Sequence, residues 1–465
     1  MFLNYLILNV NIYGFIMVGK DLGNEVGMRD LKGTAIYNQS EQIVRESIVD
    51  TLKHCFKLYG FAPIETSILE FYDIASSKYG GGSEILKETY KLKDQGEREL
   101  CLRYELTFKL SKLLAMNLDT RLPFRRYEIG KVFRDGPVKA GRLREFTQCD
   151  VDVVGVKGII AEAEFMDLSF MVFDKLKIDS TIQINSRKLL FGIFEHAKIG
   201  EGDYGKCALI LDKLEKYGGT SVKKELIESG ISKDSVDIIF ETLDLITKEH
   251  GNDAKIKKLK SILNNEQSLA GIKELEELFD LVRMIGIKGN IQYIPTLARG
   301  LGYYNGIIWE VFANNSVMKS SIAAGGRWDN MISKFLNTTK DYPACGMTFG
   351  LDAIYEVLRS KNNSKGIGIP KVLIVQIDAL GPALKLIKEM RSSGVSCELS
   401  DKGSVPKAFE YANKSQIKFT MVIGKRELSN NTITIKDMDS GDQQEIKLSD
   451  SIEFIKRKMG DNSQK

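Results

Sequence analysis

The sequence predicts a multidomain protein of mixed α/β and α+β class, in which an antiparallel sheet carries a helical insertion and precedes a small α/β domain. Three observations predict this class. Two segments with alternating residues, 125–135 and 144–155, flank a glycine-rich basic loop, as in an antiparallel hairpin. Residues 185–288 are helical in character and rich in lysine, glutamate and leucine. After residue 370, strand-like and helix-like segments alternate.

The elements before the hairpin follow from local patterns. Apolar residues at helical spacing predict a helix over 40–59, with Ser40 as its N-cap. Residues 61–69 are expected to be extended and 72–82 to form a polar loop. A short strand is predicted over 100–102 and a helix over 107–116.

Strand character resumes at Ile291 and continues to a helix predicted over 350–359. In the last part, strands are predicted over 372–377, 395–399 and 419–424, with helices over 382–392 and 405–414, a polar hairpin and a final helix. This order predicts a parallel sheet. The expected partition is an N-terminal extension (1–26), a core (27–184 and 289–361), the helical insertion (185–288), a linker (362–369) and the C-terminal domain (370–465).

Composition limits the function classes. Hydrophobic residues make up 43% and charged residues 28%, as in a soluble globular protein, and the net charge is only +4. Any contact with RNA must therefore come from local patches. Six scattered cysteines without a CxxC pair, and only three histidines, argue against a disulfide framework and a His-based metal site. We expect a cytosolic protein with reduced thiols.

The apolar N-terminal run, residues 1–16, lacks a basic leading region and a small-residue cleavage site. It is also shorter than the roughly 20 residues of a membrane-spanning helix. No membrane association is predicted.

Two glycine-rich segments, LARGLGYYNG (297–306) and SIAAGGRWDN (321–330), each contain an arginine, Arg299 and Arg327. Glycine allows close approach of a ligand to the backbone, and arginine meets carboxylates and phosphates with two donors. Tyr303 and Tyr304 add flat walls. The segments predict a pocket for a small, anionic, partly aromatic substrate.

The hairpin supplies a second group of cations. Arg134 lies on its first strand, Arg142 and Arg144 beside the loop, and Phe146 at the start of the return strand. Fixed guanidiniums suit a polyphosphate leaving group, and Phe146 could stack on a nucleobase. The plain alternative is a surface hairpin with solvated charges. No GxxxxGK[ST] motif is present, which argues against a P-loop.

Acceptors for a cationic amino group lie on neighbouring segments. They are Glu105 in LRYELT, and Gln148 and Asp152 in QCDVD. Gln148, Asp150 and Asp152 alternate and therefore share one strand face. Their pattern alone leaves open whether that face is buried or solvated.

These residues carry a resemblance to the histidyl-tRNA synthetases, which are class II aminoacyl-tRNA synthetases, from about Gly27 onward. The matching segments are GMRDL (27–31), KLKDQGERELCLRYELT (91–107), FRDGPVKAGRLREFTQCDVDVVG (133–155), LARGLGYYNG (297–306), AAGGRWDN (323–330) and CGMTFGLD (345–352). The last third, with IGKRE at 423–427, resembles the family's anticodon-binding domain.

The resemblance implies roles for individual residues. Arg134 should contact the α-phosphate and the substrate carboxylate, Arg142 the terminal phosphates, and Phe146 the adenine, with Arg327 a further candidate for ATP. Arg299 matches the arginine that stabilises charge on the transferring phosphorus. The remaining matches should surround the substrate histidine: Glu105, Leu106, Thr107, Gln148, Asp152, Tyr303 and Tyr304.

The implied reaction joins L-histidine to tRNA(His) through a histidyl-adenylate, with ATP and Mg²⁺, in the cytoplasm. GFAPIETSILE (60–70) resembles class II motif 1, which implies a homodimer. The helical insertion is expected to touch the tRNA acceptor stem. The sequence does not identify which residues, if any, would hold the metal.

Four positions depart from the family pattern. Gly302 replaces an aspartate, Trp328 a tyrosine, Ser67 the motif 1 proline and Ala353 the motif 3 arginine. That arginine normally clamps the γ-phosphate, and Arg327 or Arg142 is a hypothetical substitute.

Two other interpretations stay open. One is a non-ligating paralogue, either a regulatory subunit of histidine biosynthesis or a sensor of uncharged tRNA. The C-terminal domain argues against the regulatory subunit, and the absence of a kinase signature against the sensor. The other is an adenylate-forming ligase for a different amino acid, against which Tyr303, Tyr304 and the QCDVD strand argue through the resemblance alone.

Overall fold

The computed structural model describes residues 30–78, 82–138, 142–298, 302–360 and 369–460. The predicted N-terminal extension, Arg299, and residues 362–368 of the predicted linker lie outside this description. The chain divides into two compact units, residues 1–36 with 47–360 and residues 37–46 with 361–465, and each is described by itself.

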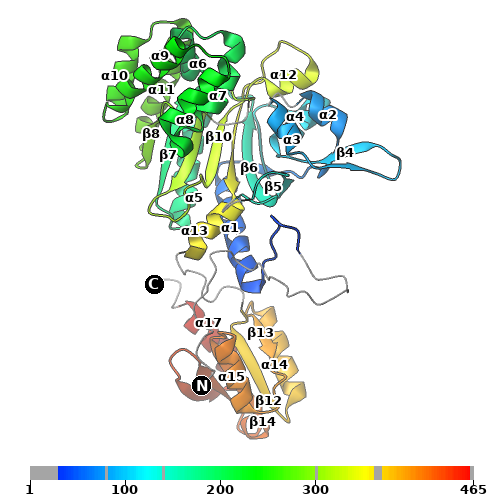
Figure 1. The fold of residues 1–465 in the computed structure, drawn as a ribbon. Coiled ribbons are helices and arrows are strands. Elements are labelled where there is room, and N and C mark those ends of the chain that lie inside the picture. The colour runs from blue at the N-terminus through cyan, green and yellow to red at the C-terminus, as the bar shows by residue number, and fades with distance from the viewer. Residues whose placement is uncertain (1–29, 79–81, 139–141, 299–301, 361–368, 461–465) are drawn as a thin grey trace, which may run out of the picture. The chain divides into compact units, whose positions relative to one another are not determined.

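An eight-stranded sheet is the centre of the first unit (Figure 1). Its neighbours are antiparallel except at the two edges, where β1 pairs with β5 and β7 with β8 in parallel. The strands are, in spatial order, β1 (Ala62–Pro63), β5 (Phe124–Phe133), β6 (Glu145–Val154), β11 (Ala344–Gly350), β10 (Ala323–Arg327), β9 (Ile307–Ala313), β7 (Ser180–Ser186) and β8 (Asn290–Tyr293). The predicted hairpin is the pair β5–β6.

Strand alternation gives this sheet one apolar face and one polar face. The apolar face packs against α1 (Gln39–Leu58) and α5 (Ile160–Lys175). The ring of Phe56 in α1 lies 5.4 Å from that of Tyr127, and Phe165 in α5 lies 6.0 Å from Trp309. Burial of these large side chains forms the core and leaves the other face for polar groups.

The predicted N-cap of α1 is wrong by two residues. Asn38, rather than Ser40, accepts a hydrogen bond from the Glu41 N–H at 3.0 Å, and the Glu41 carboxylate accepts one from the Asn38 N–H at 2.9 Å. The two residues form a capping box, and the Ser40 hydroxyl donates to the same Asn38 oxygen.

A three-stranded antiparallel sheet lies between α1 and the hairpin in sequence, with the strands β2 (Leu69–Phe71), β4 (Glu99–Leu102) and β3 (Lys91–Lys93). The predicted helix over 107–116 is confirmed as α4 (Thr107–Met116). The predicted polar loop over 72–82 is wrong, because α2 (Tyr72–Lys78) occupies most of it and α3 (Gly82–Lys87) follows. The local sequence is polar, but Ala75 is buried against Phe108 of α4. Tertiary packing therefore favours a helix over the loop that the local sequence predicts.

The segment between β7 and β8 is helical, as predicted. It contains α6 (Arg187–His196), a 3₁₀ turn (Glu201–Asp203), α7 (Tyr204–Leu211), α8 (Leu214–Glu228), α9 (Lys233–Thr247), α10 (Asn252–Ile262) and α11 (Glu266–Ile285). These helices gather at the β7–β8 end of the sheet, whereas α2, α3 and α4 lie at the β5–β6 end (Figure 1). Ser232 and Asn265 cap α9 and α11, and Gly286 ends α11 with φ of 80°. The predicted domain boundaries stay a prediction.

Two further helices, α12 (Met331–Leu336) and α13 (Leu351–Ser360), complete the unit.

The second unit contains a five-stranded sheet in the order β13–β12–β14–β15–β16. Its elements are β12 (Val372–Ile377), α14 (Leu380–Ser392), β13 (Cys397–Leu399), α15 (Val405–Lys414), β14 (Phe419–Gly424), α16 (Lys425–Ser429), β15 (Thr432–Asp437), β16 (Gln443–Lys447), a 3₁₀ turn (Leu448–Asp450) and α17 (Ser451–Gly460). The prediction of a parallel sheet holds for β13, β12 and β14. It fails for the terminal hairpin, whose strands pair antiparallel.

Within the described part of the chain, no helix combines the length and apolar character needed to cross a bilayer.

Candidate active site

Pairing register brings four residues into one row on the polar face. Arg126 on β5 faces Asp152 on β6, which faces Gly346 on β11, which faces Gly326 on β10. A Cβ at Gly346 would overlap the Asp152 carboxylate, and one at Gly326 would lie 2.6 Å from the Tyr304 ring. The two glycines therefore make room on this face for Asp152 and Tyr304.

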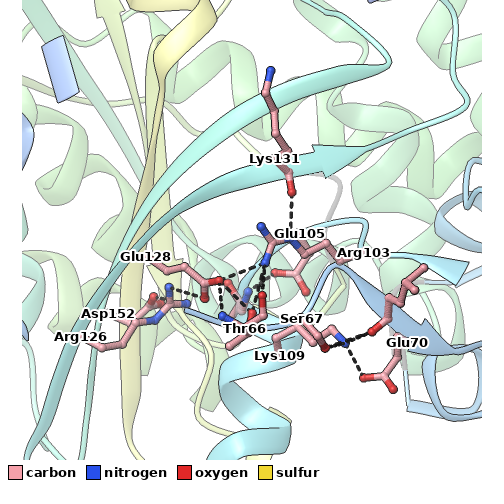
Figure 2. A network of polar contacts seen from close by, with 12 residues as sticks. Thr66, Ser67, Glu70, Arg103, Glu105, Lys109, Arg126, Glu128, Lys131 and Asp152 are labelled. Carbon is pink, nitrogen blue, oxygen red and sulfur yellow. Dashed lines mark hydrogen bonds and ion pairs between the residues drawn. The ribbon is translucent and has the colours of Figure 1, made fainter. Parts of the chain in front are cut away.

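Asp152 is buried and contacted from two sides. The Arg126 guanidinium lies 2.7 Å from its Oδ2, and the Trp328 side chain hydrogen-bonds the carboxylate (Figure 2 shows the Arg126 pair). Burial raises the pKa of Asp152, and Arg126 opposes the rise. The carboxylate is thus held in place but is costly to ionise without a cationic partner.

Asp150 and Gln148 continue the same strand face, as predicted, and both are buried. Burial also raises the pKa of Asp150, Arg126 lowers it, and the nearby Asp152 carboxylate raises it further. Gln148 Nε2 lies 3.5 Å from Thr348 Oγ1. Among the described residues, Gln148 Oε1 and Asp150 Oδ1 have no hydrogen-bond partner. Two buried acceptors of this kind are suited to the donors of a polar ligand.

Glu105 lies directly before α4, at the amino end of the helix. Its carboxylate accepts from the N–H groups of Thr107 and Phe108, at 2.6 and 2.7 Å. Burial raises the pKa of Glu105, while these backbone donors lower it. Leu106 is fully buried beside it. The helix terminus therefore fixes the carboxylate as an acceptor for a cation.

Arg134 follows β5 by one residue and is held between two aromatic rings. Its guanidinium carbon lies 4.2 Å from the centroid of Tyr104 and 5.1 Å from that of Phe146. Its Nε also donates to the Tyr104 carbonyl at 3.3 Å. Cation–π contacts orient the group while leaving most of its donors for a ligand.

Arg142 pairs with Glu88, which lies just beyond α3. The Nη2–Oε1 distance is 2.7 Å, and the Tyr104 hydroxyl donates to the same carboxylate at 3.0 Å. The structure thus brings Arg134, Arg142 and Phe146, three of the residues that the hairpin pattern singled out, together around Tyr104. Residues 139–141 of the basic loop lie outside the described residues.

Tyr303 and Tyr304 are buried, with ring centroids 4.7 Å apart. They belong to a cluster with Ile308, Trp328 and Leu110 of α4. Their place beside Gly326 agrees with a wall of the pocket. Arg299, predicted to act in the same segment, is not described.

Arg327 is on the opposite face of the sheet. It alternates with Gly326 on β10 and pairs with Glu162 of α5, with Nε–Oε1 at 2.6 Å and Nη2–Oε2 at 2.8 Å. Asp329 adds a contact at 3.1 Å. This placement does not support the predicted contact between Arg327 and ATP, and Arg327 does not substitute from this face for the missing motif 3 arginine.

The position of that arginine is occupied by Ala353 in the first turn of α13. Ala353 is buried, and its neighbour Asp352 accepts a hydrogen bond from the Thr147 N–H at 2.8 Å. This hydrogen bond ties α13 to β6, and the helix has no guanidinium at this position.

Sequence reasoning missed Arg126, Glu128 and Thr348. All three face the predicted acceptors, but only the register of β5 and β11 against β6 shows it. The available signal was the alternation of charged residues in RRYE, which the hairpin prediction did not use. Glu88 was also missed, because its partner Arg142 lies far away in sequence.

No group of three or more His, Cys, Asp or Glu side chains within the described ranges could hold a metal ion. The six cysteines are buried and form no disulfide.

Comparison with known families and proteins shows what the chain is similar to. A family model described as histidyl-tRNA synthetase matches residues 34–354, and a model described as an anticodon binding domain matches residues 371–458. The chain is 42% identical over 431 residues to histidine–tRNA ligase 1 of Bacillus cereus strain ATCC 14579, covering 92% of this chain and 99% of that protein. It is 37% identical to histidine–tRNA ligase 2 of Shouchella clausii, covering 90% and 98%.

Solved structures show the same fold. Histidyl-tRNA synthetase from Nostoc sp. PCC 7120 superposes with a TM-score of 0.80 at 30% identity, covering 93% of this chain and all of that one. A structure described as an ATP phosphoribosyltransferase regulatory subunit/histidyl-tRNA synthetase from Bacillus halodurans C has a TM-score of 0.71 at 19% identity, covering 86% and 99%, and supports the fold alone. The match to an anticodon-binding domain favours a catalytic synthetase over the regulatory paralogue. This chain, with its class II catalytic sheet and C-terminal anticodon-binding domain, belongs to the histidyl-tRNA synthetase family of histidine–tRNA ligases.

Proposed function

We propose that the polar face of the eight-stranded sheet binds L-histidine and ATP, forms histidyl-adenylate and passes the histidyl group to tRNA(His). The observation that carries the proposal is the group of buried acceptors beside the fixed guanidinium of Arg134. These acceptors are Gln148 and Asp152 on β6 and Glu105 before α4. Acceptors suit the cationic end and ring of histidine, and the guanidinium suits its carboxylate.

In this proposal, Glu105, Thr107 and Gln148 hold the α-amino group, with Leu106 closing the floor of the pocket. Asp152 accepts a ring N–H of the imidazole, and Tyr303 and Tyr304 form its walls. An amino acid without the ring nitrogens would offer no hydrogen-bond donor to Asp152 Oδ2, which is buried and accepts no hydrogen bond from the described residues, and this gives selectivity.

ATP would enter as its magnesium complex, in which the metal would neutralise part of the charge on the phosphates. Phe146 stacks on the adenine and Arg142 exchanges Glu88 for the terminal phosphates. Arg134 bridges the α-phosphate and the histidine carboxylate.

The reaction needs no enzyme nucleophile. A carboxylate oxygen of histidine attacks the α-phosphorus, and the bond to the β-phosphate oxygen breaks to release pyrophosphate. Arg134, with Arg299 from the segment outside the described residues, stabilises the charge on the phosphorus. The terminal hydroxyl of tRNA then attacks the acyl carbon and AMP leaves. Positioning and electrostatics supply the rate.

We also propose a cytoplasmic homodimer, with the helices between β7 and β8 near the tRNA acceptor stem. Support for the dimer comes from the motif 1 segment and its surroundings, where Ile68, Leu69 and Phe71 expose 42–47% of their surface in the single chain.

The alternative is a paralogue without ligase activity, which Ala353 and Gly302 favour. Charging of tRNA(His) with labelled histidine distinguishes the two. The parent protein should charge the tRNA, and Arg134→Met should lower the rate by about 100-fold or more through loss of charge stabilisation.

Arg125→Met is the matched control for this test. Arg125 is on β5, the strand that Arg134 directly follows, but it pairs with Glu164 at 2.9 Å and does not face the polar side of the sheet, so charging should stay near the parent rate. A folded parent protein that charges no tRNA would favour the paralogue, and a fully active Arg134→Met variant would refute the role of Arg134.

A further inference from the structure

Arg126 is the one fully buried guanidinium that the described residues place on the polar face, with no exposed surface at all. Its Nη2 lies 2.7 Å from Asp152 Oδ2 and its Nη1 3.7 Å from Glu128 Oε2. Neither contact has hydrogen-bonding geometry, and the described residues offer its nitrogens no hydrogen-bond acceptor. The interaction of Arg126 with its neighbours is therefore one of charge and position.

Glu128 fixes this guanidinium from the other side (Figure 2). Glu128 Oε1 accepts from the backbone N–H and the hydroxyl of Thr66, at 2.9 and 2.8 Å, and from Arg103 Nη1 at 3.0 Å. Arg103 itself donates to the Thr66 and Lys131 carbonyls, both at 2.8 Å. These hydrogen bonds fix the side-chain conformation of Glu128, so its second oxygen, Oε2, stays beside Arg126.

Asp152 has equally little freedom. Arg126 lies on one side, the Trp328 side chain hydrogen-bonds it, and Gly346 leaves space that any other residue would fill. Four strands thus determine where this carboxylate lies.

A buried ion pair of this kind adds little stability, because removing each ion from water is costly and well-packed apolar groups would stabilise the fold as well. The polar face holds four buried carboxylates, Glu105, Glu128, Asp150 and Asp152. Arg103 and Glu128 form one pair, so Arg126 is left with an excess of negative charge. A cationic ligand would neutralise part of this excess negative charge.

We propose that Arg126 is a positioning residue for histidine recognition: it holds Asp152 ionised and oriented, so that this carboxylate accepts a ring N–H of the substrate. The inference rests on the proposed function and adds a residue that does not itself touch histidine. Trp328 shares the task from the β10 side.

A dependence on pH follows from the groups that face Asp152. They are Arg126 and Glu128 from β5, Asp150 on its own strand, Glu105 ahead of α4 and Trp328 after β10. Arg126 is the cation among them, so its removal raises the pKa of Asp152 further. More Asp152 is then protonated at neutral pH, and raising the pH restores the carboxylate.

The test is histidine-dependent ATP–pyrophosphate exchange by Arg126→Met, Arg126→Lys and the control Arg125→Met, with KM measured for histidine and for ATP between pH 6.5 and 8.5. For Arg126→Met we expect KM for histidine to rise at least about tenfold at pH 7, the equivalent of one pKa unit, and to fall back as the pH rises. KM for ATP should stay within about twofold, because ATP does not contact Asp152 in the proposed complex. Arg126→Lys should recover part of the histidine affinity, and the control should match the parent.

Trp328→Phe keeps an aromatic ring but removes the N–H, so it tests the same idea if Arg126→Met does not fold. It should raise KM for histidine several-fold and leave KM for ATP unchanged. Equal losses for both substrates, or a histidine KM that does not respond to pH in either variant, would overturn the positioning role. Failure of the parent itself to exchange with histidine would instead refute the proposed function, so the two failures are distinct.

Discussion

At the scale of the residue, burial decides the chemistry of the candidate site. Asp150 and Asp152 lie two positions apart on one strand face, and burial raises the pKa of both. The Asp152 carboxylate raises the pKa of Asp150 further, and Glu105 and Glu128 raise that of Asp152. Without a cationic ligand, ionising both carboxylates costs free energy that folding must offset. Glu105 differs because helix donors compensate part of its burial.

Asp150→Asn should therefore stabilise the ligand-free protein, and more so at higher pH. The pKa of Asp150 is raised in the folded state, so the folded protein binds the proton more tightly than the unfolded chain. Stability is then lost as the pH rises above the ordinary aspartate value of about 3.9 toward the raised folded value. Asparagine has no charge to bury and can still accept from Thr348.

Thermal unfolding at pH 5 and pH 8 measures this effect, with Asp244→Asn on the exposed face of α9 as the control. The Tm gain of Asp150→Asn should be larger at pH 8 than at pH 5. A gain that is equal at both pH values, or a loss, would mean that Asp150 carries no ionisation penalty in the folded protein.

At the scale of the element, local pattern predicted most strands and helices but not their partners. The long strands of the hairpin, α4 and the strands and helices of the second unit follow the sequence periodicity. The loop predicted over 72–82 failed because Ala75 is buried by α4, a contact that the segment itself does not encode. The second sheet is mixed because its last hairpin adds antiparallel strands to a parallel core.

The site was predictable to the same degree. Alternation in QCDVD placed Gln148, Asp150 and Asp152 on one face, but which face is covered depends on α1 and α5. Arg126 and Arg327 show what the sequence alone could not predict. Both are strand arginines, but only the pairing register shows that Arg126 lies on the polar face of the sheet and Arg327 on the opposite face.

The ion pair between Arg327 and Glu162 joins β10 to α5, and its energetic role is testable. Arg327→Met should lower the stability by about 3 kcal/mol, because it leaves the buried Glu162 charge without its cation, and Glu162→Gln should cost less, because Arg327 keeps its contact with Asp329. The double variant should lose less than the sum of the two, since the Glu162 charge is then absent. Denaturant unfolding of the four proteins gives this cycle.

Kinetics separate this structural role from the predicted contact with ATP. In the variants that remain folded, KM for ATP should be close to that of the parent. A large increase in KM for ATP in Arg327→Met, with stability unchanged, would show that Arg327 reaches the nucleotide after all.

At the scale of the whole molecule, the proposed dimer predicts a particle of twice the 52.2 kDa chain mass. Light scattering on the eluting peak of a sizing column measures it directly. Phe71→Glu, which introduces a charge on an exposed apolar side chain near motif 1, should shift the population toward monomer, whereas Leu384→Glu in the second unit should not. A parent protein that is monomeric at micromolar concentration would contradict the proposed assembly.

The catalytic core and the anticodon-binding domain are both present, yet the motif 3 helix begins with Ala353 in place of arginine. The central claim is that the remaining groups, Arg134 and Arg142 above all, suffice for adenylate formation. ATP–pyrophosphate exchange with the purified protein, with magnesium present and each of the other amino acids as controls, tests it most directly. Exchange that depends on histidine alone is the predicted result. Folded protein that exchanges with no amino acid would contradict the claim, and exchange with a different one would contradict the assignment of the pocket.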